Sequence, residues 1–443
     1  MKHFSIVFLC LLISCALYAQ EPARKALIGA TGKFNEKGMQ VDSIVKGSTM
    51  NAAGLQKDDI ITAINTQPLK DNTAFNSVAS GIRAGDEVII TYIRNGKQKT
   101  KKVKAVMRPH ETSDIADVYY EWVPYGKCKL RAITRKPKNK TNAPAVLLVP
   151  GYNCGTVENY MSGIYKNLVT EWLKNGYVVV TVEKSGMGDS YNCSPCSQVD
   201  LATDIQTFDA GYRYMEALPY VDKNNLFIWG HSMGGVIAPE LARNHNPKGV
   251  IAFATVFRPW AEFLPEMHRV QFPLDGHSFE KTEQDVRLIH RIYDEFFTDK
   301  KSVQQLYNET PEYRDMLVRE FGYKKGNEDL WGRHYRFWQQ IDSLDMAAAW
   351  SDVKCPVLSV FGGADFIACS ELEHQLITRT VNSVRPGNCT HITIPDLDHL
   401  ILRNNNWEEA YNTFNDRSSW PEKYHTGFPV TVTKWMNEQV AKP

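Results

Sequence analysis

Apolar residues beyond position 140 are concentrated in short, nearly continuous runs, with helix-length segments between most of them. Six such runs occur in the order APAVLLVPG, YVVVTVEKS, NLFIWGHS, GVIAFAT, CPVLSVFGG and HITIPDL. Strands that are apolar throughout and alternate with helices are typical of a mostly parallel sheet covered by helices on both faces. Two earlier runs, VYYEWVPYG and CKLRAITRKP, predict an antiparallel hairpin at the start of this α/β domain. We expect the domain at residues 119–440, after a linker at 109–118.

One segment interrupts this alternation at about residues 257–348, between the fourth and fifth runs. Its pattern is helical, and it is rich in aromatic and charged residues. A connection of that length predicts an inserted helical cap rather than a loop. Helical spacing predicts that most of its aromatic residues form the cap core and that about a third line a pocket. These residues are Trp260, Phe263, Trp331, Tyr335, Phe337 and Trp338.

Residues 24–108 instead alternate short strands with tight turns around one helix. Helical residues at about 73–82 precede two strands joined by an Asn95-Gly96 turn. The stretch VDSIVKGSTMNAAGLQKDDIITAINTQPL resembles bacterial-type PDZ domains, in which the signature G-S-x-A-x-x-A-G-L-x-x-G-D-x-I-x-x-I-N recurs. Asp58 stands where that family usually has glycine. The resemblance implies a small, mainly β PDZ domain.

PDZ domains add an extended peptide to a sheet edge and hold its C-terminal carboxylate in a nest of backbone N–H groups. The resemblance implies that the corresponding loop here is formed by Leu27, Ile28, Gly29 and Ala30. A peptide or protein C-terminus would then be the partner of this domain. The alternative is that the module only packs against its neighbour.

The N-terminus has the pattern of an export signal. A short basic start, an apolar stretch from Phe4 to Leu17 and a small-residue exit at Ala19 predict a signal peptide over residues 1–19. We therefore expect a periplasmic or secreted protein. The stretch is too short to span a membrane, and no second hydrophobic segment is long enough. As an alternative, residues 12–15 resemble a lipobox that would anchor the protein through Cys15.

The composition is that of a globular protein, with 43% hydrophobic and 23% charged residues. The formal net charge of +1 provides no field that would favour nucleic acid, so no such partner is expected. The alternating lysines of residues 97–104 are interpreted as a solvated strand.

Seven of the nine cysteines lie beyond the signal, and an oxidising compartment should pair some of them. Cys193-Ser-Pro-Cys196 fits a loop disulfide, a redox pair or half of a zinc site. No second Cys/His pair completes a metal site, so we expect a structural Cys193–Cys196 disulfide and no metal. Cys369 and Cys389 could form another bridge, and Cys154 is expected to be buried or disulfide-bonded.

Ser232 lies in the turn GHSMGG, which follows an apolar strand and begins a helix. Small residues allow a serine to project from such a sharp bend, with the positive end of the following helix aimed at developing negative charge. A serine needs a base, and the base needs a carboxylate that orients it. Asp365 and His399 follow the next predicted strand ends in the order Ser…Asp…His.

This order, with EKSGMGDS at residues 183–190, resembles the α/β-hydrolase superfamily of serine hydrolases. The resemblance implies Ser232 as nucleophile, His399 as general base and Asp365 as its orienting carboxylate. Asp396 and Asp398 are alternative orienting groups, although turn or surface roles suit them better.

Acyl transfer also requires N–H donors for the tetrahedral oxyanion. The residue after the nucleophile, Met233, would supply one backbone N–H. The loop after APAVLLVPG would supply the other, for which we favour Tyr152 over Asn153. Many relatives carry His-Gly where this chain has Pro150-Gly151.

Together these patterns predict a cofactor-independent serine hydrolase that cleaves small carboxylic esters. One alternative is a peptidase of the prolyl-oligopeptidase-like kind, although the β-propeller of that group is missing from the sequence. A second alternative is a PDZ-based adapter in which the hydrolase fold is only a scaffold.

Overall fold

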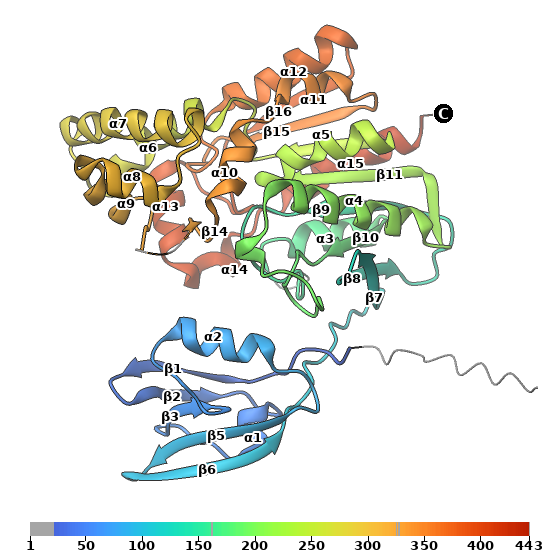
Figure 1. Ribbon diagram of the computed structural model, residues 1–443. Coiled ribbons are helices and arrows are strands. Elements are labelled where there is room, and N and C mark those ends of the chain that lie inside the picture. Colours follow the sequence, from blue (N-terminus) through green and yellow to red (C-terminus); the bar gives the residue numbers. More distant parts are fainter. Residues whose placement is uncertain (1–21, 161–162, 325, 327, 443) are drawn as a thin grey trace, which may run out of the picture. The chain divides into compact units, whose positions relative to one another are not determined.

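The computed structural model describes residues 22–160, 163–324, 326 and 328–442. The predicted signal peptide and Cys15 lie outside the described residues. The chain divides after Pro109 into two compact units, which are described separately (Figure 1).

The described residues of the first unit form a small antiparallel sheet with two helices. Its strands follow the order β1-β2-β3-β5-β6, with β4 paired to β3. Asn95 and Gly96 both have positive φ in the turn between β5 and β6, as expected of a two-residue hairpin. Asp58 has a φ of 69°, a region that favours glycine, which accounts for the family preference at this position. The elements are β1 (Ala30–Asn35), β2 (Gly38–Ile44), α1 (Thr49–Ala52), β3 (Ile60–Ile64), β4 (Gln67–Pro68), α2 (Asn72–Gly81), β5 (Glu87–Arg94) and β6 (Lys97–Lys104).

The second unit contains an eight-stranded sheet in the order β16-β15-β12-β11-β9-β10-β8-β7. The hairpin β7–β8 is antiparallel, and the six strands from the apolar runs pair in parallel with one another. This agrees with the mixed, mostly parallel sheet predicted from the sequence. The strands are β7 (Ala116–Tyr125), β8 (Cys128–Pro137), β9 (Ala143–Val149), β10 (Val178–Val182), β11 (Val221–His231), β12 (Gly249–Phe253), β15 (Val357–Gly362) and β16 (Cys389–Ile394).

Helices cover both faces of this sheet. Apolar residues of α4 (Leu201–Ala217), α5 (Met233–His245) and α12 (Glu371–Val384) belong to the core on one face. Those of α3 (Lys166–Lys174) and α15 (Gly427–Val440) belong to the core on the other face. The apolar strands are therefore buried on both sides, as their composition predicts. Two short helices, α13 (Trp407–Asn415) and α14 (Trp420–Lys423), precede α15.

The predicted insertion lies between β12 and β15 and is mainly helical. In Figure 1 its helices α6 to α9 form one group at an end of the sheet. Its core is continuous with the core under α4 and α5, so the insertion is packed onto the eight-stranded sheet rather than separate from it. Its elements are α6 (Trp260–Leu274), α7 (Phe279–Tyr293), α8 (Val303–Glu309), α9 (Arg314–Arg319), β13 (Asp329–Leu330), β14 (Arg333–His334), α10 (Tyr335–Asp342) and α11 (Met346–Asp352).

Candidate active site

Ser232 occupies a strained turn between β11 and α5. Its φ of 55° and ψ of −121° lie in a region that residues with a side chain rarely adopt. The turn requires the neighbouring glycines, because a Cβ on Gly234 would lie 2.0 Å from the carbonyl oxygen of Val149. A Cβ on Gly230 would lie 2.4 Å from the carbonyl oxygen of Gly234. The close packing of strand and helix thus explains the sequence of this turn.

The side chains of His399 and Asp365, which the sequence analysis places together in the site, are in contact. The Nδ1 of His399 lies 2.9 Å from Oδ2 of Asp365, which is fully buried. The other carboxylate oxygen accepts the backbone N–H groups of Ile367 and Ala368 at 2.8 Å. Burial opposes the charged imidazolium, but the charge and hydrogen bond of Asp365 outweigh it and raise the pKa of His399. The hydrogen bond to Asp365 therefore fixes the orientation of the His399 ring.

The alternative carboxylates have other partners. Asp398 accepts the backbone N–H groups of Leu400 and Leu402 at 2.8 Å and therefore closes a turn. Asp396 accepts from His425 and pairs with Arg403. Neither carboxylate orients the imidazole of His399.

His231 is a site residue that the sequence analysis did not single out. It is buried directly before Ser232, and its Nε2 lies 2.8 Å from the carbonyl oxygen of His399. Its Nδ1 lies 2.6 Å from the hydroxyl of Tyr165. In the sequence, the position of His231 beside Ser232 was the one indication of its importance. Its contact with His399 forms only when the chain folds.

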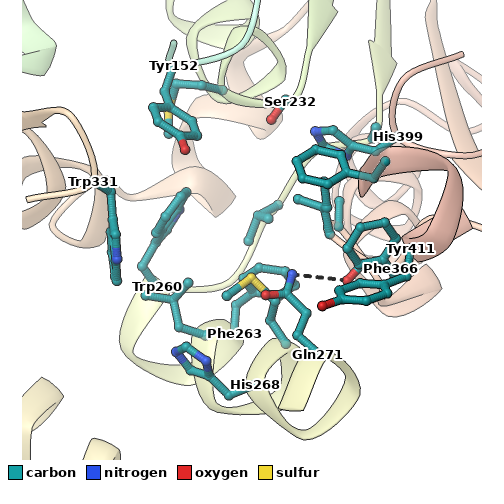
Figure 2. A pocket seen from close by; sticks show the side chains of 18 of the residues that line it. Tyr152, Ser232, Trp260, Phe263, His268, Gln271, Trp331, Phe366, His399 and Tyr411 are labelled. Carbon is teal, nitrogen blue, oxygen red and sulfur yellow. Dashed lines mark hydrogen bonds between the residues drawn. The ribbon is translucent and has the colours of Figure 1, made fainter. Parts of the chain in front are cut away.

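Ser232 and His399 line one pocket with a volume of about 430 Å³. Figure 2 shows these two residues on one side of the pocket and Trp260 and Trp331 on the other. Tyr152 and Met233 also line it. Of the six cap aromatics, four reach the pocket, more than the predicted third: Trp260, Phe263, Trp331 and Trp338.

The loop after β9 lies against the serine. A Cβ on Gly151 would be 3.4 Å from Cβ and 3.7 Å from Oγ of Ser232. Met233 is the first residue of α5, where backbone N–H groups have no acceptor within the helix. Met233 thus directly follows Ser232, and Tyr152 follows the glycine that packs against it.

The predicted Cys193–Cys196 disulfide is wrong. Cys193 pairs with Cys128 on β8, and Cys196 pairs with Cys154 in the loop after β9. A 3₁₀ turn begins at Cys196, so the two cysteines of the loop face different segments. Cys369 and Cys389 do not pair with each other, and both are buried thiols.

The predicted peptide loop of the first unit packs on α1. The carbonyl oxygens of Leu27 and Ile28 accept the N–H groups of Thr49 and Met50 at 2.8 and 3.1 Å. Gly29 has a φ of 77°, and a Cβ there would lie 2.1 Å from Cβ of Ser48. Ala30 begins β1, which is an edge strand of its sheet. An edge strand is the element to which a bound peptide can add.

Within the described ranges, no group of three or more His, Cys, Asp or Glu side chains could hold a metal ion. None of the described helices is both long and apolar enough to span a membrane.

Comparison with known proteins confirms both family resemblances. A model of the family described as serine aminopeptidase, S33, matches residues 142–406, and a PDZ domain model matches residues 26–105. The chain is 18% identical over 269 residues to the esterase EstD of Thermotoga maritima, across 60% of this chain and 56% of that protein. It is 28% identical over 91 residues to the serine protease Do-like HtrA of Bacillus subtilis, across 20% of each protein. The chain thus spans between a fifth and just over half of the length of these two relatives.

The solved structure of Est1E from Butyrivibrio proteoclasticus is also similar. It aligns at 15% identity with a TM-score of 0.43, across 73% of this chain and 99% of that chain.

Proposed function

Because the chain belongs to the serine aminopeptidase S33 family of α/β hydrolases and carries an N-terminal PDZ domain, we propose that it is an exported serine esterase. The observation that carries this proposal is the shared pocket of Ser232 and His399, with His399 bound to buried Asp365. Cleavage of a carboxylic ester needs these groups and no metal or organic cofactor.

In the proposed mechanism, His399 accepts the proton of Ser232 as its Oγ attacks the ester carbonyl. Asp365 holds the imidazole and stabilises its charged form. The N–H groups of Met233 and Tyr152 stabilise the tetrahedral oxyanion. Its collapse expels the alcohol, which takes the proton from His399, and leaves an acyl-enzyme. Water activated by His399 then releases the acid and restores Ser232.

The lining of the pocket favours an ester whose acyl or alcohol part is apolar or aromatic. Its walls are dominated by aromatic rings and aliphatic side chains, and such surfaces bind apolar groups by excluding water. Beyond the cap aromatics, these include Leu264, Met267, Phe272, Phe366 and Phe414.

The test is the initial rate of hydrolysis of p-nitrophenyl esters from acetate to octanoate by the chain without its first 19 residues. We expect turnover that Ser232→Ala abolishes and that the exposed-site control Ser383→Ala leaves unchanged. The preferred acyl length would measure the usable depth of the pocket. No turnover of any ester would contradict the esterase proposal.

A peptidase is the second candidate, because two carboxylates line the same pocket. Asp275 and Glu320 are both acidic and could hold a substrate amine. Aminoacyl p-nitroanilides test this candidate. Their cleavage by the wild type but not by Ser232→Ala, with no ester turnover, would favour it.

For the PDZ domain we propose binding of a peptide C-terminus, with its carboxylate at Leu27, Ile28, Gly29 and Ala30. Edge strand β1 supports this role, since a peptide can pair with it. Binding of C-terminal peptides is expected, and amidation of the peptide should abolish it. Peptide binding without turnover of any ester or amide would instead support the adapter.

Export is proposed from the N-terminal pattern of residues 1–19 and from the two disulfides, which form in oxidising compartments. Fractionation of expressing cells tests it. The mass of the mature protein distinguishes cleavage after Ala19 from lipid attachment at Cys15.

A further inference from the structure

Two buried cations bind three successive carbonyl oxygens of the loop after β9. The Nζ of Lys184 donates to the carbonyl oxygens of Gly151 and, at 3.1 Å, Asn153. The Nη1 of Arg333 donates to the carbonyl oxygen of Tyr152 at 3.0 Å. Lys184 is 2% exposed and Arg333 is fully buried. Because burying a cation is costly, two of them on one short loop call for an explanation.

The two cations come from different parts of the fold. Lys184 lies in the turn after β10, whereas Arg333 lies on β14 of the insertion. Arg333 also pairs at 2.9 Å with Asp204, a fully buried residue of α4. Its guanidinium lies 3.9 Å from the ring centroid of Phe337. The insertion therefore contacts both α4 and the main chain of the loop beside Ser232.

The geometry of the peptide bond means that each of these carbonyl contacts also fixes the direction of the following N–H group. A trans peptide places a carbonyl oxygen and the following N–H on opposite sides. Binding the Gly151 carbonyl to Lys184 therefore directs the N–H of Tyr152 away from Lys184. Binding the Tyr152 carbonyl to Arg333 fixes the N–H of Asn153 in the same way. The far end of the loop is held by the Cys154–Cys196 disulfide.

We infer that Lys184 and Arg333 are positioning residues that fix the oxyanion-binding N–H of the loop beside Ser232. The inference rests on the proposed hydrolysis at Ser232, since only that reaction gives the N–H an oxyanion to bind. It makes the insertion a part of the catalytic geometry as well as a wall of the pocket. A loop without its two cations is free to rotate its peptide groups, and the oxyanion then loses a donor.

The main test variant combines Arg333→Met with Asp204→Asn, so that no unpaired charge stays buried. Lys184→Met tests the second cation by itself. Asp204→Asn alone is measured for comparison, because it removes the ion pair of Arg333 but keeps the contact of Arg333 with Tyr152. Arg336→Met, at an exposed arginine on α10, controls for loss of charge in the insertion.

Four quantities are measured: kcat and KM on the best p-nitrophenyl ester, the Ki of an alkyl trifluoromethyl ketone, and hydrogen exchange of the segment 150–156. The ketone adds a serine to give a hemiketal oxyanion, so its Ki reports the donors directly. We expect both test variants to lower kcat by about 10–100-fold and to raise Ki similarly, with KM changed less than about threefold. Exchange in the segment should accelerate, and Arg333→Lys should recover part of the lost kcat.

Folded test variants whose kcat and Ki stay at wild-type values would overturn the inference, as would an equal loss in the Arg336→Met control. If the double variant does not fold, Lys184→Met decides by the same criteria. If the wild type hydrolyses nothing, the proposed function fails, but exchange still tests the positioning. In that case faster exchange in segment 150–156 supports it, and unchanged exchange overturns it.

Discussion

His231 and His399 are joined through the main chain, with Nε2 of His231 2.8 Å from the carbonyl oxygen of His399. Burial lowers the pKa of His231 to about 3, so its ring is neutral and carries one proton. A carbonyl only accepts hydrogen bonds, so this proton is on Nε2 and the Tyr165 hydroxyl donates to Nδ1. The residue before the proposed nucleophile therefore fixes the backbone of the proposed base.

We predict that His231→Ala lowers kcat for esters by about 10–100-fold and changes KM little, because the imidazole of His399 loses its alignment with Ser232. Initial rates on the folded variant measure this effect. Tyr165→Phe is the milder comparison, since it removes the hydrogen bond to Nδ1 but leaves the Nε2 contact available. A His231→Ala enzyme with wild-type kcat would show that the contact has no role in alignment.

The pH dependence follows from the pair of Asp365 and His399. The base must be neutral to accept the serine proton, and Asp365 raises the pKa of His399 even though burial opposes the charged form. The acid limb of kcat/KM should therefore have its midpoint above about pH 6.5, the ordinary value for histidine. Asp365→Asn should move the limb to lower pH and reduce kcat by about 10⁴-fold.

The same pair makes the free energy of unfolding depend on pH, and the raised pKa of His399 fixes the direction of that dependence. Because folding raises the pKa of His399, its protonated form stabilises the folded state. This contribution is fully present at pH values below the unfolded pKa of about 6.5. The contribution declines as pH rises through the folded pKa of His399. Urea unfolding of the wild type and Asp365→Asn should therefore differ less at pH 9 than at pH 6. A difference that grows with pH would contradict this assignment.

The sequence predicts the features that depend on nearby residues. Apolar runs such as Ala143–Val149 identify the strands, and the turn at Ser232 is recognisable from its glycines. The contacts of Arg333 with Tyr152 and of Cys196 with Cys154 depend on segments that meet only after folding. An arginine in a charged insertion has the pattern of a surface residue, so its burial could not be predicted.

The two disulfides are predicted to contribute differently to activity but similarly to stability. They close loops with separations of 65 and 42 residues, for which the chain-entropy relation gives about 4 kcal/mol each. Replacing Cys154 and Cys196 together by serine should also lower kcat, because that bridge holds the loop beside Ser232. Replacing Cys128 and Cys193 should lower the free energy of unfolding but leave kcat unchanged. Urea unfolding and ester rates of the two double variants measure both effects, and equal losses of kcat would contradict a specific role for the 154–196 bridge.

In the PDZ unit, buried Asp59 stabilises the fold through Arg94. The two residues form paired hydrogen bonds of 2.7 and 2.6 Å, and the N–H of Gln56 donates at 2.8 Å. Burial raises the pKa of Asp59, but the hydrogen bonds and charge of Arg94 outweigh it, so the pKa is lowered. The ionised carboxylate therefore stabilises the folded unit fully above the unfolded pKa of about 3.9. This contribution is lost as pH falls through the lowered pKa of the folded state.

We therefore predict that Asp59→Asn destabilises the PDZ unit by about 2 kcal/mol at pH 7, the partly exposed arginine moderating the loss. Hydrogen exchange of β3 and β5 in the full chain measures this opening free energy. The neighbouring exposed Asp58→Asn is the matched control, because asparagine tolerates the positive φ at that position. The difference between Asp59→Asn and the wild type should shrink as pH falls below the unfolded pKa of about 3.9, because the lowered pKa of Asp59 ties its contribution to the ionised form. Equal exchange in both variants at pH 7 would show that the Asp59–Arg94 pair does not stabilise this unit.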